Sequence, residues 1–104
     1  MFEIFKRLFA PKDNQDLLEA LQQGAFLVDV RTPIEFSFGS VSGATNIPLD
    51  KLLNSLPMFK NKKKIVVFCR SGSRSSKAKK MLEDNGFQGV INGGSWQNVN
   101  QIIK

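Results

Sequence analysis

Apolar and polar positions along the chain alternate in blocks that predict helices and strands in turn. Residues 13–24 predict a helix with Leu17, Leu18 and Leu21 on one face, a capping Asp or Asn at its start and a glycine at its end. Residues 26–30 are short, apolar and β-branched, which is typical of a strand covered on both faces in a parallel sheet.

The next segment carries a strong helix-start signal. Thr32 is a good N-cap, Pro33 suits the first helical position, and Glu35 can complete a capping box. Further on, residues 45–47 predict a strand. A short helix is then expected from a cap at Asp50 to a stop at Pro57, presenting leucines at 52, 53 and 56.

The second half repeats the pattern. Residues 65–68 predict a second central strand, which delivers Cys69 at its carboxyl end and leads into a Ser/Gly loop. A helix is expected from Ser75 to a stop at Asn85-Gly86, followed by a short strand at residues 90–91. The last helix, residues 96–103, should pack on the core through Trp96, Val99, Ile102 and Ile103.

Strands alternating with helices predict an α/β fold, a three-layer domain with a central, mainly parallel sheet flanked by helices. The 104 residues suit one domain, residues 1–104. Residues 1–12 mix apolar and charged positions without the continuous apolar run of a secretory signal, so we expect a cytoplasmic protein. This segment predicts either an amphipathic extension for a membrane surface or partner, or a helix packed on the domain's own core. Membrane contact is the less favoured reading.

Charge adds a preference for anions. The chain has a net charge of +6, and its densest basic stretches, Lys60–Lys64 and Lys77–Lys80, flank the Cys69 loop in the sequence. Neither stretch has interleaved aromatic residues or a nucleic-acid motif, so we expect no nucleic-acid partner. For these two basic stretches, a solvated surface and the steering of small anions both stay open.

Cys69 is the only cysteine, and the chain has no histidine. This composition excludes Cys/His zinc sites, Cys-His nucleophile pairs, CxxC redox pairs and an intramolecular disulfide. We therefore expect no metal and no cofactor, and a cysteine that works alone or has only a packing role.

The loop after Cys69 favours a reactive thiolate. Backbone N–H groups at a helix start stabilise negative charge, and nearby arginines lower a thiol pKa without a general base. A glycine permits close approach of a ligand, and the serines offer hydroxyl donors. The predicted substrate-binding residues are Arg70, Ser71, Gly72, Ser73, Arg74 and Ser75.

Four segments follow one another along the chain: residues 29–36 (DVRTPIEF), 39–48 (GSVSGATNIP), 67–75 (VFCRSGSRS) and 92–96 (NGGSW). In this order they resemble the rhodanese family of sulfurtransferases, most closely its small single-domain, phage-shock-type thiosulfate sulfurtransferases. Ser40 and Ser42 stand where the family usually has His and Pro, which we interpret as a change in a surface connection. The spacing from the glycine pair to Trp96 is also shorter than usual.

The resemblance implies that Cys69 takes the outer sulfur of thiosulfate or a similar small anionic donor, holds it as a persulfide, and passes it to a thiol or cyanide. A protein acceptor is a further option, and we expect a monomer. In this family the residues at Asp29 and Arg31 are structural supports, not catalysts. The donor and acceptor in the cell stay open.

Two other functions compete. A cysteine-dependent phosphatase or arsenate reductase encloses an oxyanion with Cys-x5-Arg, whereas only four residues separate Cys69 from Arg74 here. A non-catalytic rhodanese-like interaction module or persulfide carrier is the other alternative, although inactive relatives usually lose the cysteine that this chain keeps.

Overall fold

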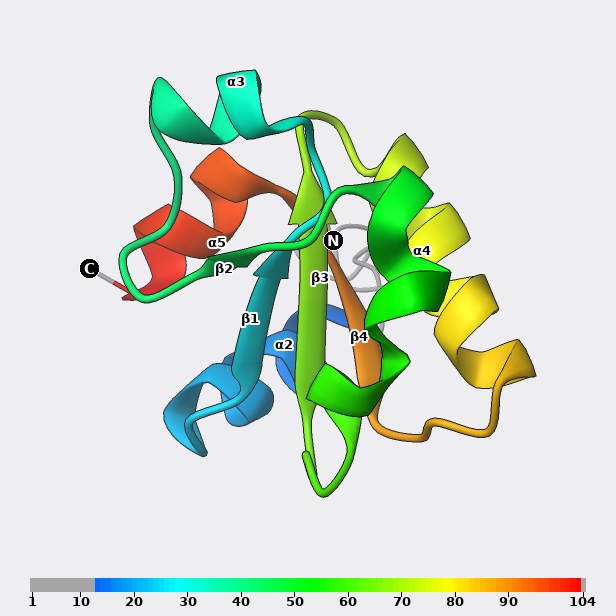
Figure 1. The fold of residues 1–104 in the computed structure, drawn as a ribbon. Helices are drawn as coiled ribbons and strands as arrows, with labels where there is room; N and C mark the ends of the chain where they lie inside the picture. Colours follow the sequence, from blue (N-terminus) through cyan, green and yellow to red (C-terminus); the bar gives the residue numbers. More distant parts are fainter. Residues whose placement is uncertain (1–12, 104) are drawn as a thin grey trace.

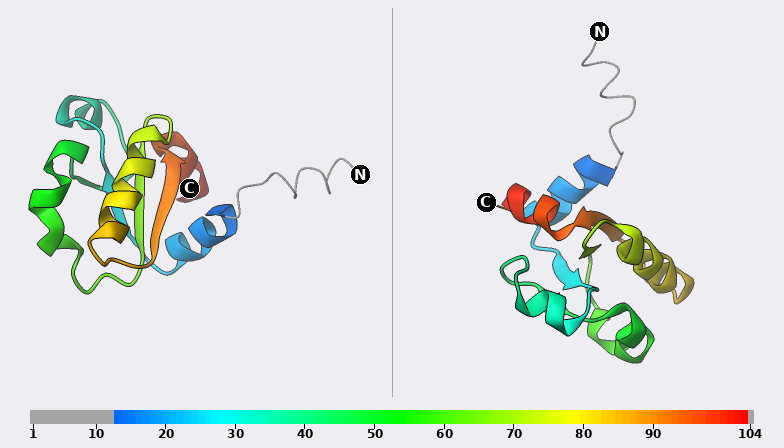
Figure 2. Two further views of the ribbon diagram at one scale, coloured as in Figure 1. Left: turned by 90° about the vertical axis from the view of Figure 1, so that its right-hand side faces the viewer. Right: turned by 90° about the horizontal axis from the view of Figure 1, so that it is seen from above.

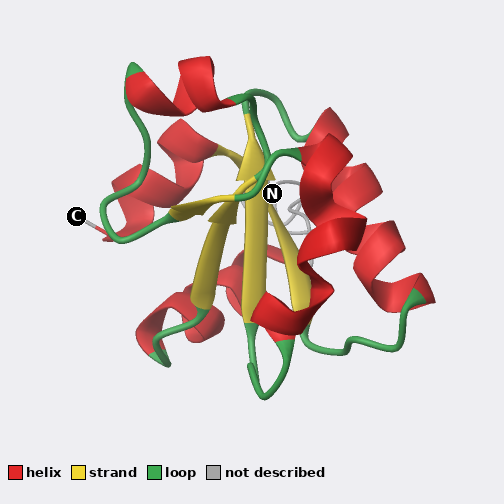
Figure 3. Ribbon diagram, viewed as in Figure 1, coloured by secondary structure: helices red, strands yellow, loops and turns green. Residues whose placement is uncertain are grey.

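The computed structural model describes residues 13–103 as one sheet with helices around it (Figure 1). The prediction for residues 1–12 lies outside this range. Figure 3 shows the alternation of helix and strand expected from the sequence. The elements are α2 (Asp13–Gln22), β1 (Phe26–Asp29), α3 (Pro33–Ser37), β2 (Thr45–Asn46), the 3-10 helix η1 (Leu49–Phe59), β3 (Ile65–Cys69), α4 (Ser73–Asp84), β4 (Val90–Ser95) and α5 (Trp96–Ile103).

The sheet has the strand order β2-β1-β3-β4, and every neighbouring pair is parallel. β3 lies in the middle, and all five of its residues are buried, as its continuous apolar run predicts. Because the strands are parallel, their carboxyl ends share one edge of the sheet, the upper edge in Figure 1. This is the edge at which open α/β sheets bind ligands.

Helices cover both faces, which confirms the three-layer α/β prediction. η1 and α4 lie on one side of the sheet, and α2 and α5 lie on the other (Figure 2). Side chains of β3 alternate between the two cores: Ile65, Val67 and Cys69 join the first, and Val66 and Phe68 the second. Cys69 therefore points toward the layer that contains α4.

Two apolar residues are on the surface: Leu18, from the predicted apolar face of the first helix, and Ile103, which was predicted to pack on the core. Leu18 is 46% exposed and Ile103 is 43% exposed. Each is adjacent in sequence to an apolar residue that does pack against the α2/α5 core, Leu17 or Ile102. Adjacent helical residues point about 100° apart, so a narrow contact with the sheet buries one and leaves the other in solvent.

The segment before β3 also differs from its prediction. The expected helix from Asp50 to Pro57 is a 3-10 helix that begins at Leu49, has no side-chain cap, and continues through Pro57 to Phe59. Burial of Phe59, which is 0% exposed, explains the extra turn, since its ring packs edge-on against Phe26.

The bounds of two other elements differ from the predictions. α4 begins at Ser73, two residues before the expected Ser75, and β4 extends the predicted strand at residues 90–91 as far as Ser95. Within residues 13–103, every helix is too short or too polar to cross a lipid bilayer.

Candidate active site

Cys69 ends the central strand, and the chain turns directly into α4. The turn is made by Gly72, whose φ of 99° lies in the left-handed region that favours glycine, and Gly72 is the N-cap of α4. A helix N-terminus leaves N–H groups without partners inside the helix. The strand therefore delivers a thiol to a set of free amide donors.

The sulfur accepts these donors directly. The Gly72 N–H lies 3.0 Å from the Cys69 Sγ, the Ser75 N–H lies 3.4 Å from it, and the Ser75 hydroxyl is also 3.4 Å away. Burial raises the pKa of the thiol, but hydrogen bonds from the hydroxyl and amide of Ser75 and the amides of Ser71 and Gly72 outweigh it, so the pKa of Cys69 lies below its usual value. The predicted thiolate thus has a structural cause.

Asn92 on β4 completes this network, and the sequence analysis did not single it out. Its Oδ1 accepts the Ser75 hydroxyl at 2.6 Å and the Gly94 N–H at 2.9 Å, and its Nδ2 donates to the Gly72 carbonyl at 3.3 Å. Both sides of the Cys69 loop are therefore held by one amide side chain. The available signal was a polar residue directly after the apolar pair of a predicted buried strand.

The two loop arginines have different environments. Arg74 forms a two-pronged ion pair with Glu35 of α3, with N–O distances of 2.6 and 2.9 Å. This pairing raises the pKa of Arg74 and, with the Thr32 backbone N–H, lowers the pKa of Glu35 from 4.5 to about 2. Arg70 is exposed on the loop. The structure therefore leaves Arg70 facing solvent and ties Arg74 to a carboxylate.

The other predicted substrate-binding residues differ in how exposed they are. Ser71 and Ser73 are exposed, whereas Ser75 is 0% exposed and contacts the sulfur. Gly72 supplies the shortest amide contact to Sγ. Ser71 and Ser73 are thus the hydroxyls on the outside of the loop.

Asp29 and Arg31 form a buried ion pair at the carboxyl end of β1, with a shortest N–O distance of 2.7 Å. Arg31 also donates to the Gly39 carbonyl at 2.6 Å, and its guanidinium lies 5.3 Å from the centre of the Trp96 ring. The pair therefore connects β1 to the chain after α3 and to α5. The hydrogen bonds of these two residues stay within this network and do not reach Sγ, so their role as supports of the site stays a prediction.

Ser40 corrects one sequence interpretation. Its hydroxyl donates to Asp29 Oδ2 at 2.7 Å, so this position belongs to the buried ion-pair network and not to a mere surface connection. Ser42 is exposed, as that interpretation expected. A donor at position 40 satisfies a buried carboxylate oxygen, which explains why a serine can replace another polar residue here.

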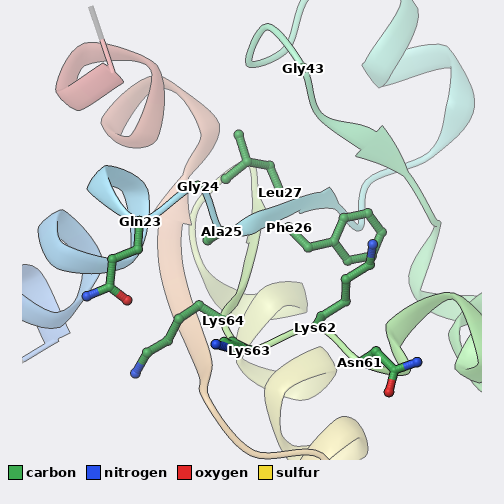
Figure 4. A pocket seen from close by; sticks show the side chains of 10 residues that line it. All are labelled: Gln23, Gly24, Ala25, Phe26, Leu27, Gly43, Asn61, Lys62, Lys63 and Lys64. Carbon is green, nitrogen blue, oxygen red and sulfur yellow. The ribbon is translucent and has the colours of Figure 1, made fainter.

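One of the two basic stretches lies at the edge of the sheet opposite to Cys69. Lys62, Lys63 and Lys64 line a groove of about 720 Å³ at the amino-terminal edge of the sheet (Figure 4). β3 separates this groove from Cys69, a span of roughly 16 Å for five extended residues. The stretch at residues 60–64 therefore flanks the Cys69 loop in the sequence and not in space, and the exposed basic residue on the loop itself is Arg70. In residues 13–103, no group of three or more metal-ligating side chains occurs.

The rhodanese-like domain family model matches residues 13–101. The chain belongs to this family. The match spans every element from α2 to most of α5, and it agrees with the resemblance carried by the four sequence segments. The phage-shock type within the family stays a prediction.

Rhodanese-like relatives include named sulfurtransferases. A sulfurtransferase of Allochromatium vinosum is 30% identical over 82 residues, covering 77% of this chain and 77% of that protein. The structure of the human single-domain sulfurtransferase TSTD1 superposes with a TM-score of 0.66 at 28% identity, covering 81% of this chain and 88% of that one.

Other relatives carry the domain in longer proteins. The tRNA uridine(34) hydroxylase of Erwinia tasmaniensis is 36% identical over 78 residues, which are 67% of this chain and 22% of that enzyme. The chain spans 45% and 54% of the length of two further curated relatives. The rhodanese-like domain thus occurs in proteins whose names indicate different activities.

Proposed function

We propose that this rhodanese-like protein is a sulfurtransferase that moves the outer sulfur of thiosulfate, or of a similar donor, to a thiol or cyanide through a persulfide on Cys69. The observation that carries the proposal is the position of Sγ, which accepts two backbone amides and lies against a hydroxyl. An environment that stabilises a thiolate also stabilises the negative terminal sulfur of a persulfide.

The first step is a displacement at sulfur. The Cys69 thiolate attacks the outer sulfur of thiosulfate, the S–S bond of thiosulfate breaks, and its electron pair leaves with sulfite. The exposed Arg70 attracts the dianionic donor to the loop. The amides of Gly72 and Ser75 stabilise the anionic sulfur before and after transfer.

In the second step, cyanide or an acceptor thiolate attacks the terminal sulfur of the persulfide. The S–S bond of the persulfide breaks, and its electron pair returns to Cys69 as the thiolate. No proton needs to be removed from Cys69 during the cycle if the thiolate is the resting form. This accounts for a site that works without a histidine.

The ion pair of Arg74 argues against the phosphatase alternative. A phosphate-binding loop needs a guanidinium fork directed at the oxyanion. Here both terminal nitrogens of Arg74 bind Glu35 instead. Together with the four residues between Cys69 and Arg74, this favours a loop that holds the single transferred sulfur atom over one that encloses a phosphate.

Mass spectrometry tests the proposal without ambiguity, because the chain has a single cysteine. Incubation with thiosulfate should add the mass of one sulfur atom, and cyanide should remove it and yield thiocyanate. Cys69→Ser should abolish the gain, whereas Ser76→Ala, an exposed change in the same helix, should retain it. An unchanged mass after thiosulfate and after a persulfide donor such as glutathione persulfide would reject sulfur transfer.

Two further readouts separate the alternatives. Hydrolysis of p-nitrophenyl phosphate that depends on Cys69 would favour the phosphatase. A stable persulfide that neither cyanide nor small thiols discharge would favour a carrier that serves a dedicated partner.

A further inference from the structure

Two large apolar side chains project into solvent from the short helix beside the active-site loop. Ile34 is 70% exposed and Phe38 is 88% exposed. They are four residues apart, at the start and the C-cap of α3, so they lie on the same side of the helix. α3 lies at the carboxyl edge of the sheet, the edge at which β3 ends in Cys69 (Figure 1).

This apolar surface, Ile34 with Phe38, is held firmly in place. Thr32 and Glu35 form a reciprocal capping box at the start of α3, and Glu35 also binds Arg74 of α4. After α3, the Gly39 carbonyl accepts a hydrogen bond from Arg31. A helix tied at both ends exposes its apolar residues in a fixed position, which reduces the entropy lost when a partner binds.

The charges around the same loop are mostly positive. Arg70, on the Cys69 loop, and Lys77, one helical turn after Arg74 in α4, are both exposed, and Arg74 neutralises the Glu35 carboxylate. Asp50, the exposed acid in the first turn of η1, is followed directly by the exposed Lys51. A partner that covers this end of the domain would thus contact two apolar side chains and an excess of positive charge.

We infer that the Ile34–Phe38 surface and the adjacent Arg70 and Lys77 form a docking site for an acidic acceptor protein, which presents its cysteine next to apolar residues. The inference rests on the proposed sulfur transfer and names the class of acceptor for that site. Cyanide and small thiols have no apolar surface to bury on Phe38, so the surface adds nothing to their reaction. A protein acceptor gains both apolar contact and charge complementarity.

Two synthetic acceptor peptides provide the test, each with one cysteine. In the first the cysteine is flanked by leucine, phenylalanine, aspartate and glutamate; in the second, serine and lysine replace them. The persulfide form of the wild-type chain should transfer sulfur to the first peptide about tenfold faster than to the second, which corresponds to the loss of one good interface contact.

Surface variants then locate the effect. Phe38→Ser with Ile34→Ser should reduce the preference to the part that charge supplies, measured as the peptide rate divided by the cyanide rate of the same variant. Leu18→Ser is the matched control, because Leu18 is also apolar and exposed but lies on α2, away from the carboxyl edge of the sheet. An unchanged preference in the double variant would overturn the inference.

Binding is measured separately from transfer, using the first peptide with serine in place of its cysteine. Amide resonances of α3 should shift in NMR spectra on adding this peptide. If the chain forms no persulfide, the proposed function fails while this arm still tests the surface. Shifts at α3 caused only by anionic phosphatidylglycerol vesicles, or only by raising the concentration of the chain itself, would reject a protein acceptor in favour of a membrane or a second copy.

Discussion

Replacing Ser75 with alanine should raise the pKa of Cys69, because it removes a hydroxyl from the donors that surround the sulfur. The Ser75 hydroxyl lies 3.4 Å from Sγ and 2.6 Å from Asn92 Oδ1. Having one proton, it cannot donate fully to both. In the thiol form it binds Asn92, and as negative charge develops on sulfur it can turn toward Cys69. Asn92 Oδ1 still accepts a hydrogen bond from the Gly94 N–H, so rotation of the Ser75 hydroxyl leaves this oxygen with a partner.

The magnitude follows from this sharing. A hydrogen bond to a charged group contributes about 1.5 to 3 kcal/mol, and the long contact to sulfur places Ser75 at the low end. Since about 1.4 kcal/mol is a factor of ten in an equilibrium, Ser75→Ala should raise the pKa of Cys69 and lower its thiolate fraction below that pKa about tenfold. The amides of Gly72 and Ser75 remain, because the substitution keeps the backbone.

The assay is the rate of alkylation of Cys69 by iodoacetamide as a function of pH, with the thiolate absorbance as a second readout. Below the pKa, Ser75→Ala should react about tenfold more slowly than the wild type, and the two rates should converge at high pH. Ser76→Ala, an exposed serine next to it, is the control and should match the wild type. A Ser75→Ala variant that melts like the wild type yet titrates at the same or a lower pH would refute this account of the thiolate.

Two further predictions concern stability. Glu35→Gln should remove about 1 kcal/mol from the free energy of unfolding at neutral pH, since its ion pair with Arg74 is partly exposed. Folding lowers the Glu35 pKa from 4.5 to about 2, so the stabilisation by the ion pair is complete above pH 4.5 and is lost as the pH falls toward 2. Urea unfolding curves of the variant and the wild type should therefore converge near pH 2. A difference in unfolding free energy that stays constant with pH would contradict the prediction. Gly93→Ala should lower the free energy of unfolding by about 1 to 3 kcal/mol, because the added Cβ would lie 2.7 Å from Val99 Cγ2 and 3.1 Å from Val66 Cγ1. Thermal melting measures this loss. An unchanged melting temperature would show that the two valines can move.

The architecture was predictable because each main element carries its own local signal. The apolar run of β3 and the capping box of Thr32 and Glu35 need no distant partner to be recognised, and both occur where expected. The exposure of a helical side chain depends instead on which face of the helix packs against the sheet. That is why the prediction that Ile103 packs on the core was wrong, and why Leu18 is exposed although it was predicted on the apolar face of its helix.

The candidate site was predictable only in its contiguous part. Residues that follow Cys69 in sequence share its loop, so their spacing indicated a cradle of amides and hydroxyls. Asn92 comes from another strand, and its pairing with Ser75 depends on β4 lying beside β3. No local pattern records such a contact across strands.

Arg74 shows most clearly how a distant contact changes a chemical role. From its position five residues after Cys69, it is a natural anion ligand. In the folded chain it binds Glu35, which lies 39 residues away. The Glu35 carboxylate also completes the capping box of α3, the helix that exposes Ile34 and Phe38. Through Arg74 it anchors α4, whose first turn donates a hydrogen bond to Cys69. Weakening this ion pair should slow transfer to an acidic protein acceptor more than transfer to cyanide, because only the protein acceptor depends on the position of α3 as well as on the loop.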